Sequence, residues 1–163
     1  MKKFATILIG MLLILTTFVG CTAEETNYIT LDDDTYDMSK SEYKDACKKI
    51  KYKDFRYETK YMEEHKKIKC KGQVVQICNE QDSESNYYSE YRVAITKEKW
   101  GDGDYTYTDD IYVYYMLEDN PKLFEDDIVT LYGEVTDSVT FTTRLDIERT
   151  VPAMVAVYVD IKD

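Results

Sequence analysis

Five side chains that could form a ligand-binding surface fall on the polar faces of two segments in which apolar and polar residues alternate. Tyr88 and Arg92 lie in the first segment, and Tyr112, Tyr114 and Met116 lie in the second. A tyrosine offers a flat apolar ring and a hydroxyl, so a cluster can stack on a sugar, a peptide or an aromatic group and hydrogen-bond its edge. The alternative is structural, because cross-strand aromatic pairs stabilise a sheet by about 0.2 to 1 kcal/mol each. Both interpretations stay open for these candidate ligand-binding residues.

The sequence offers no pattern for catalysis. His65 is the only histidine, and no Ser, Cys or Asp stands near it in a known nucleophile pattern. One histidine and scattered cysteines also lack the clustered spacing of a zinc site. We therefore expect no catalytic residue, no metal and no cofactor, and the protein is predicted not to be an enzyme. A metal-dependent hydrolase or nuclease is the weakest alternative.

Four aspartates crowd the predicted loop between these two segments and raise the question of calcium, which binds several loop oxygens of this kind. An EF-hand register counted from the first aspartate would need Gly at position 107 and Glu at position 113, where the chain has Tyr107 and Val113. Solvated charges in a long hairpin are the simpler interpretation, and the question of calcium stays open. The four residues are Asp102, Asp104, Asp109 and Asp110.

The first 21 residues have the pattern of an export signal. Lys2 and Lys3 supply the positive start, residues 7–19 form an apolar run, and the small Gly20 precedes Cys21. The segment resembles a bacterial lipoprotein signal, which implies a diacylglyceryl group on Cys21, a palmitate-type lipid anchor, and a location on the extracytoplasmic face of the cell membrane. The alternative is an uncleaved anchor, for which the apolar run is shorter than the ~20 residues of a spanning helix.

Composition limits the partners of the remaining chain. Lys2 and Lys3 are the only charges in residues 1–20, so their removal changes the formal net charge from −11 to −13. Polyanions are held by Lys and Arg, so this acidity predicts no nucleic-acid partner and no binding of anionic headgroups. We expect instead a protein or glycan partner in the cell envelope. The length suits one domain.

Three cysteines remain after Cys21 is assigned to lipid. Cys70 and Cys78 fall in one predicted strand, and at ~3.3 Å per residue their separation far exceeds the ~7 Å limit between bridged Cα atoms. A disulfide would therefore have to use Cys47, and whether it does stays open. Three small buried thiols are the favoured interpretation.

The chain is predicted to have three parts: a signal peptide at 1–20, an acidic flexible tether at 21–38, and one domain at 39–163. Ser39 and Glu42 have the spacing of a capping box, which predicts a helix over residues 39–50. A short helical turn is expected at 53–57 and another at 122–127. Period-two alternation predicts five strands, at residues 66–79, 87–97, 110–117, 128–135 and 154–161.

Gly72 and Gly133 interrupt two of these strands, as glycines do where a sheet bends or bulges, and this favours a closed five-stranded OB-fold Greek-key barrel, an all-β fold with a short N-terminal helix. Residues 68–75, 110–114, 124–133 and 151–153 resemble the small OB-fold lipoproteins of Gram-positive bacteria, related to the tRNA-anti-like branch. That family is mostly of unknown function, so the resemblance implies a fold but no ligand.

The candidate binding residues lie on the second and third predicted strands, the face with which OB-folds bind ligands. The sequence therefore predicts a membrane-anchored, extracytoplasmic OB-fold binding or interaction module of unknown ligand. The alternative is an accessory or structural protein of the cell envelope without a small ligand.

Overall fold

The computed structural model describes residues 31, 33–55, 66–79, 88–116, 121–142 and 146–162. The predicted signal peptide, Cys21, most of the predicted tether and His65 lie outside the described residues. Within the described ranges, no helix is long and apolar enough to cross a membrane.

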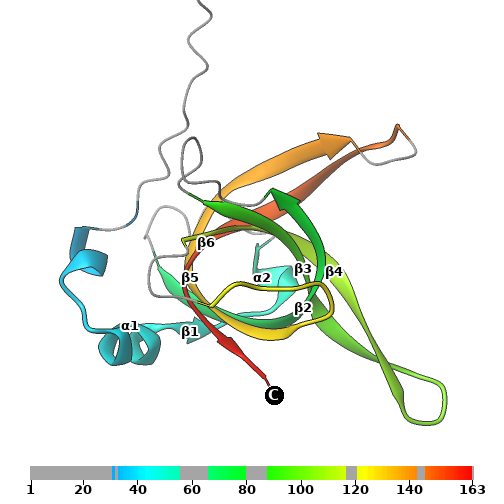
Figure 1. Ribbon diagram of the computed structural model, residues 1–163, viewed down its shortest axis with the longest axis horizontal. Coiled ribbons are helices and arrows are strands. Elements are labelled where there is room, and N and C mark those ends of the chain that lie inside the picture. Colours follow the sequence, from blue (N-terminus) through cyan, green and yellow to red (C-terminus); the bar gives the residue numbers. More distant parts are fainter. Residues whose placement is uncertain are drawn as a thin grey trace, which may run out of the picture.

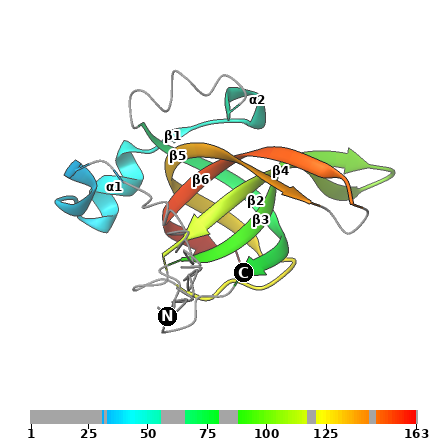
Figure 2. The ribbon, with the colours of Figure 1, turned by 90° about the horizontal axis from the view of Figure 1, so that it is seen from above.

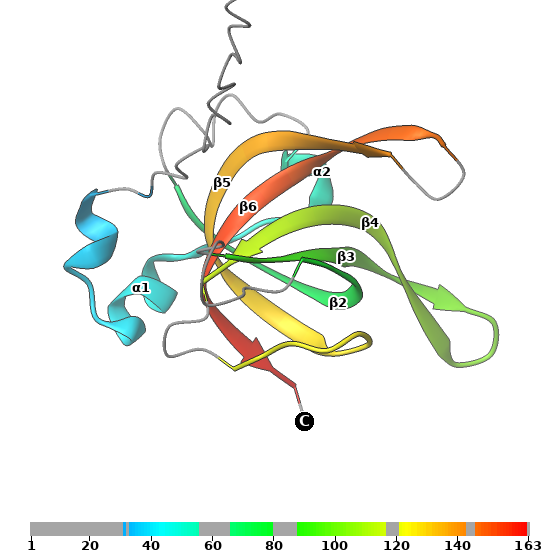
Figure 3. The same ribbon diagram turned by 45° about the horizontal axis from the view of Figure 1, so that its top comes forward.

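Five long strands close into a barrel. They are β2 (Lys67–Asn79), β3 (Ser89–Trp100), β4 (Asp104–Tyr115), β5 (Ile128–Thr142) and β6 (Glu148–Ile161). The order around the barrel is β2-β3-β4-β6-β5, and β5 pairs back onto β2 (Figures 1 and 3). All of these pairs are antiparallel except β4 with β6, which is parallel. A closed five-stranded Greek-key barrel of this kind is the OB-fold, so the predicted fold class is confirmed.

The barrel interior is filled by the apolar side of the predicted alternation. Tyr91 and Val93 of β3 and Ile111, Val113 and Tyr115 of β4 are buried together in the main core. Their neighbours at odd spacing point outward, as a period of two requires. The core also contains Phe55 and Leu123, which come from segments outside the barrel strands.

Two hairpins extend past the barrel on the side away from α1 (Figures 1 and 2). One is the β3–β4 hairpin, where Lys97 pairs with Tyr107 and only residues 101–103 form the turn. The other is the β5–β6 hairpin, where Thr142 pairs with Glu148. The third, fourth and fifth predicted strands were therefore too short, because residues 104–109, 136–142 and 148–153 also belong to β4, β5 and β6. Polar residues dominate these extensions, although Val139 and Phe141 keep an apolar alternation.

The N-terminal helix begins as predicted. In α1 (Lys40–Ala46) the Ser39 side chain accepts from the Glu42 N–H and the Glu42 carboxylate accepts from the Ser39 N–H, so the capping box is confirmed. The helix ends four residues earlier than predicted, because the next residues form the short strand β1 (Lys48–Lys49), parallel to β2. The following helical turn, α2 (Tyr52–Phe55), places Phe55 in the core.

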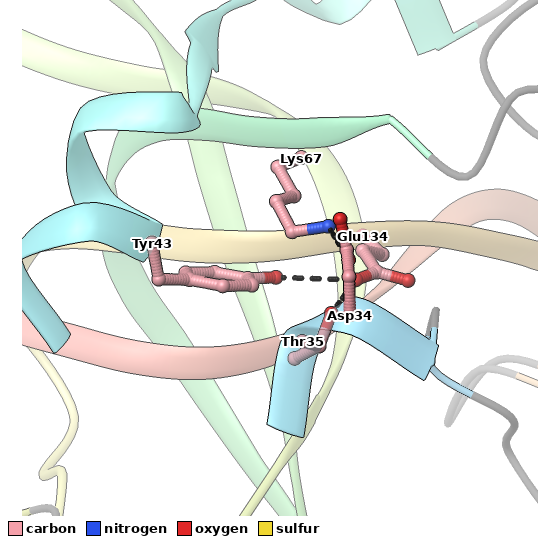
Figure 4. Close-up of polar contacts among 5 residues, drawn as sticks. All are labelled: Asp34, Thr35, Tyr43, Lys67 and Glu134. Carbon is pink, nitrogen blue, oxygen red and sulfur yellow. Dashed lines mark hydrogen bonds and ion pairs between the residues drawn. The ribbon is translucent and has the colours of Figure 1, made fainter. Parts of the chain in front are cut away.

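A 3-10 helix, η1 (Asp33–Tyr36), precedes α1, so residues 33–36 differ from the flexible tether predicted there. Figure 4 shows the contacts that hold it on the barrel. The Thr35 hydroxyl donates to the buried Glu134 carboxylate over 2.6 Å, and Tyr43 of α1 donates to the same oxygen over 3.4 Å. Lys67 of β2 pairs with Asp34. These contacts join η1 and α1 to β5, and η1 also to β2.

The helical turn predicted at 122–127 is absent, and residues 121–124 run without regular structure into a turn at 125–126. The reason lies in competing hydrogen bonds. The Asp127 carboxylate accepts from the Phe124 N–H over 2.8 Å, and the backbone of residues 126–127 exchanges two hydrogen bonds with Val74 of β2. Asp126 adopts a positive φ of 73°, which ends any helical path.

The three described cysteines are free. Cys47 and Cys70 are buried, as predicted, and burial raises the pKa of their thiols to about 11 and about 12. Cys78 is exposed, so the prediction that all three would be buried is wrong for this residue. It lies near the end of β2, where the register shifts against β3 and the alternation of the core is broken.

Candidate ligand-binding face

The five predicted binding residues lie along the outer side of β3 and β4. Arg92 is opposite Tyr112 in the antiparallel ladder, and Tyr114 is opposite Glu90. Tyr88 precedes β3, and its ring meets that of Tyr114 edge to face, with centroids 6.3 Å apart. The Tyr112 and Tyr114 rings also meet edge to face at 5.3 Å. Four of the five residues thus gather into one row, with Met116 partly buried just beyond the end of β4.

Arg92 fastens three strands and the β5–β6 hairpin together. Its guanidinium donates to Gln76 of β2 over 2.8 Å and pairs with Asp110 of β4. It also lies over the Phe141 ring of β5, 5.0 Å from the centroid. The side chain is only 19% exposed, and its buried Nε has no hydrogen-bond partner. These contacts hold the Arg92 side chain in place, so it supports the neighbouring surface residues and is not a mobile charge.

Tyr112 is covered. It is only 8% exposed and packs with Val151 and Ala153 of β6 in a second apolar cluster outside the barrel, to which Val139 and Phe141 of β5 contribute. Its hydroxyl donates to the Glu90 carboxylate over 2.6 Å. Burial, followed by this hydrogen bond, raises the pKa of Tyr112 well above its usual range, so the phenol stays protonated. For Tyr112 the structural interpretation fits the geometry.

Tyr88 and Tyr114 remain partly exposed, and we call this pair the tyrosine shelf. Burial raises the pKa of both phenols, with a further contribution from Tyr36 at Tyr88 and from Glu90 at Tyr114. Both hydroxyls are therefore protonated donors at neutral pH, and the Glu90 carboxylate near Tyr114 is an acceptor. A flat apolar edge with donors and an acceptor suits a sugar or a peptide group.

The aspartates that raised the question of calcium do not form one loop. Asp102 lies in the hairpin turn and Asp104 begins β4, whereas Asp109 and Asp110 are several residues further along that strand. Asp110 is paired with Arg92. In the described part of the chain, no group of three or more His, Cys, Asp or Glu side chains is arranged to hold a metal ion.

Sequence reasoning missed the residues that support the shelf. Glu90 and Asp110 hold Tyr112 and Arg92, and Phe141 with Val139 covers them from the β5–β6 hairpin. The sequence does contain a pattern that could have placed Val139 and Phe141 in a longer strand. Together with Val135 they keep an even spacing beyond residue 135, where the strand was predicted to end. No sequence pattern indicates which residues on the outer side of β3 and β4 the β5–β6 hairpin covers.

No protein-family model and no curated protein matches this chain. Among solved structures, the chain is similar to a small single-stranded DNA-binding protein of Streptomyces coelicolor, with 17% identity, a TM-score of 0.44, and coverage of 59% of this chain and 93% of that one. It is also similar to mitochondrial single-stranded DNA-binding protein of S. cerevisiae, with 11% identity, a TM-score of 0.34, and coverage of 58% and 92%. The expectation that excluded a nucleic-acid partner is corrected, because both neighbours are named as DNA-binding proteins.

Proposed function

We propose that this protein is a membrane-anchored, extracytoplasmic OB-fold module that binds a protein or glycan of the cell envelope through the tyrosine shelf. The observation that carries the proposal is the partly exposed Tyr88–Tyr114 pair on the β3–β4 face, the face that OB-folds use for ligands. The anchor and the location rest on the signal-like residues 1–21.

The residues next to the tyrosine shelf favour a binding role for the Tyr88 and Tyr114 rings over a purely structural one. Tyr112 and Arg92 already fill the packing and hydrogen-bonding roles on this face, since both are held by carboxylates of the neighbouring strand. Tyr88 meets Tyr114 edge to face next to these residues, and Tyr114 also contacts the Tyr112 ring at the edge of the second cluster, yet both rings keep an exposed part. Rigid side chains with few rotatable bonds lose little conformational entropy on binding, which suits them to recognition.

Affinity capture from solubilised cell envelope with the full-length chain tests this proposal. The Tyr88→Leu/Tyr114→Leu variant keeps apolar bulk but removes both rings and hydroxyls, so we expect it to lose the captured partner. The matched control is Tyr105→Leu/Phe124→Leu, because those rings are 58% and 59% exposed and lie away from the shelf. Circular dichroism during heating verifies that both variants are folded.

Equal capture by the shelf variant and its control would reject the tyrosine shelf as the binding surface. A parallel titration with single-stranded oligothymidine tests whether the protein binds nucleic acid instead. Oligothymidine binding that depends on Tyr88 and Tyr114, without capture of an envelope component, would keep the surface and replace the proposed partner.

The anchor has its own test. Labelled palmitate is expected to enter the wild-type chain in growing bacteria and not the Cys21→Ala variant, because the thiol of Cys21 is the proposed attachment point. Fractionation of the same cultures measures whether the variant leaves the membrane. Equal labelling of the two chains would contradict the anchor.

A further inference from the structure

A second surface feature is separate from the tyrosine shelf. A pocket of about 400 Å³ lies where the β1–α2 segment meets β2, β3 and β4, and its volume is within the about 300 to 1,000 Å³ of small-molecule sites. It shares no lining residue with the shelf. Its lining comprises Lys49, Ile50, Lys51, Tyr52, Lys71, Ile95, Thr96, Lys97 and Tyr107.

The lining is basic in an acidic protein. Four of its nine residues are lysines and none is Asp or Glu, although the whole chain has 32 acidic and 21 basic residues. In the described ranges, none of these four lysines is in an ion pair. Asp54 accepts from the backbone N–H of Lys51 and does not line the pocket. Clustered ammonium groups repel one another, and a bound anion would relieve that repulsion.

The pocket also has an apolar side. Ile50 is buried in the barrel core, and Ile95 and Tyr52 pack against that core from the pocket. Tyr107 of β4 adds a second ring, opposite Lys97 in the β3–β4 ladder. Lys97 lies over the Tyr105 ring at 3.7 Å, which holds its stem along the hairpin. Cations therefore stand beside rings and aliphatic side chains.

From this juxtaposition we propose that the pocket binds a small molecule that carries a phosphate or sulfate group and an aromatic or apolar portion. Lysine ammonium groups would hold the anionic group through charge-assisted hydrogen bonds, while Tyr52, Tyr107 and the isoleucines contact the remainder. The same chemistry is offered by a soluble phosphate ester and by the headgroup of an anionic phospholipid. The proposal is independent of the tyrosine shelf.

The test uses phenyl phosphate as the probe and phenol as its neutral counterpart. Calorimetric titration into the full-length chain in non-ionic detergent, at about 0.15 M salt, limits long-range attraction to a Debye length of about 8 Å. We expect phenyl phosphate to bind and phenol not to bind. The Lys49→Gln/Lys51→Gln variant should bind phenyl phosphate about tenfold more weakly, the equivalent of about 1.4 kcal/mol.

A matched control is available in the same stretch of chain. Lys48→Gln/Lys53→Gln removes two exposed positive charges from β1 and α2 that do not line the pocket, and it should leave the affinity unchanged. Absence of binding to the wild type, or equal weakening in both variants, would overturn the proposal. The proposal would also be overturned if oligothymidine bound in a way that needs Lys49 and Lys51 while phenyl phosphate did not bind.

A short-chain lipid separates the two sources of the ligand. Soluble dihexanoyl phosphatidylglycerol that binds more tightly than phenyl phosphate, with the same dependence on Lys49 and Lys51, supports the site and assigns it to a lipid headgroup. The reverse order supports the site and assigns it to a soluble phosphate ester. The shelf variant Tyr88→Leu/Tyr114→Leu should bind both probes normally, so failure of one proposal is distinguishable from failure of the other.

Discussion

Tyr112 and Tyr114 show how two identical residues on one side of a strand acquire different roles. Both point away from the barrel interior, as alternation requires. The β5–β6 hairpin lies over Tyr112, which is buried and donates to Glu90, whereas Tyr114 remains partly exposed beside Tyr88. A substitution of Tyr112 would therefore report on packing, and only the shelf residues can separate binding from stability.

At the same scale, the ion pair between Lys44 of α1 and Asp160 of β6 makes a pH-dependent contribution to stability. The Lys44 hydrogen bond, assisted by one from Tyr132, holds the pKa of Asp160 below its usual value. A lowered folded-state pKa stabilises the protein above the unfolded pKa of about 3.9, and this stabilisation is lost as the pH falls through the folded pKa. Because Asp160 is 49% exposed, we expect Lys44→Gln to lower the free energy of unfolding by only about 0.5 kcal/mol at pH 7.

Urea unfolding at pH 7 and at about pH 3 measures that difference. The gap between the wild type and Lys44→Gln should shrink at the lower pH, because the Asp160 carboxyl then binds a proton in the unfolded state and the stabilisation from its lowered folded-state pKa is progressively lost. Lys48→Gln serves as the control, since Lys48 is exposed on β1 and should show no such pH dependence. A gap of the same size at both pH values would show that Lys44 stabilises through packing on the Tyr132 ring, which lies 4.8 Å away.

The helices and strands that could be predicted from the sequence are those marked by a pattern of residues close together in the chain. The capping box at Ser39 and Glu42 set the start of α1, and alternation identified all five barrel strands. The end of α1 was missed because Lys48 and Lys49 leave the helix to pair with β2, which is a contact far along the chain. The turn at 125–126 was missed for the same reason, since Val74 supplies its backbone partners.

The two candidate surfaces differ in how far sequence could find them. The tyrosine shelf follows from alternation on two neighbouring strands, so its residues were predicted, although the cover over Tyr112 was not. The lysine-lined pocket collects residues from five elements, β1, α2, β2, β3 and β4. No spacing within the chain connects Lys49 to Lys97, and only the closed barrel brings them together.

In the molecule as a whole, barrel closure depends on the seam between β5 and β6. Gly133 of β5 lies at a register shift in that seam, and a Cβ atom there would stand 1.8 Å from the carbonyl oxygen of Val155. The obstacle is backbone, which cannot rotate away as a side chain can. The strand must therefore move, and β5 also pairs with β2, so both sides of the closure are disturbed.

We accordingly expect Gly133→Ala to lower the free energy of unfolding by about 3 kcal/mol in urea denaturation. Gly101→Ala is the matched control, because Gly101 has a φ of 60° in the hairpin turn and no atom within 4 Å of an added Cβ, so it should lose only about 1 kcal/mol from backbone strain. Equal losses would mean that the seam yields to a methyl group. A larger loss at Gly133 identifies close backbone approach between β5 and β6, rather than glycine's flexibility, as the reason this position lacks a side chain.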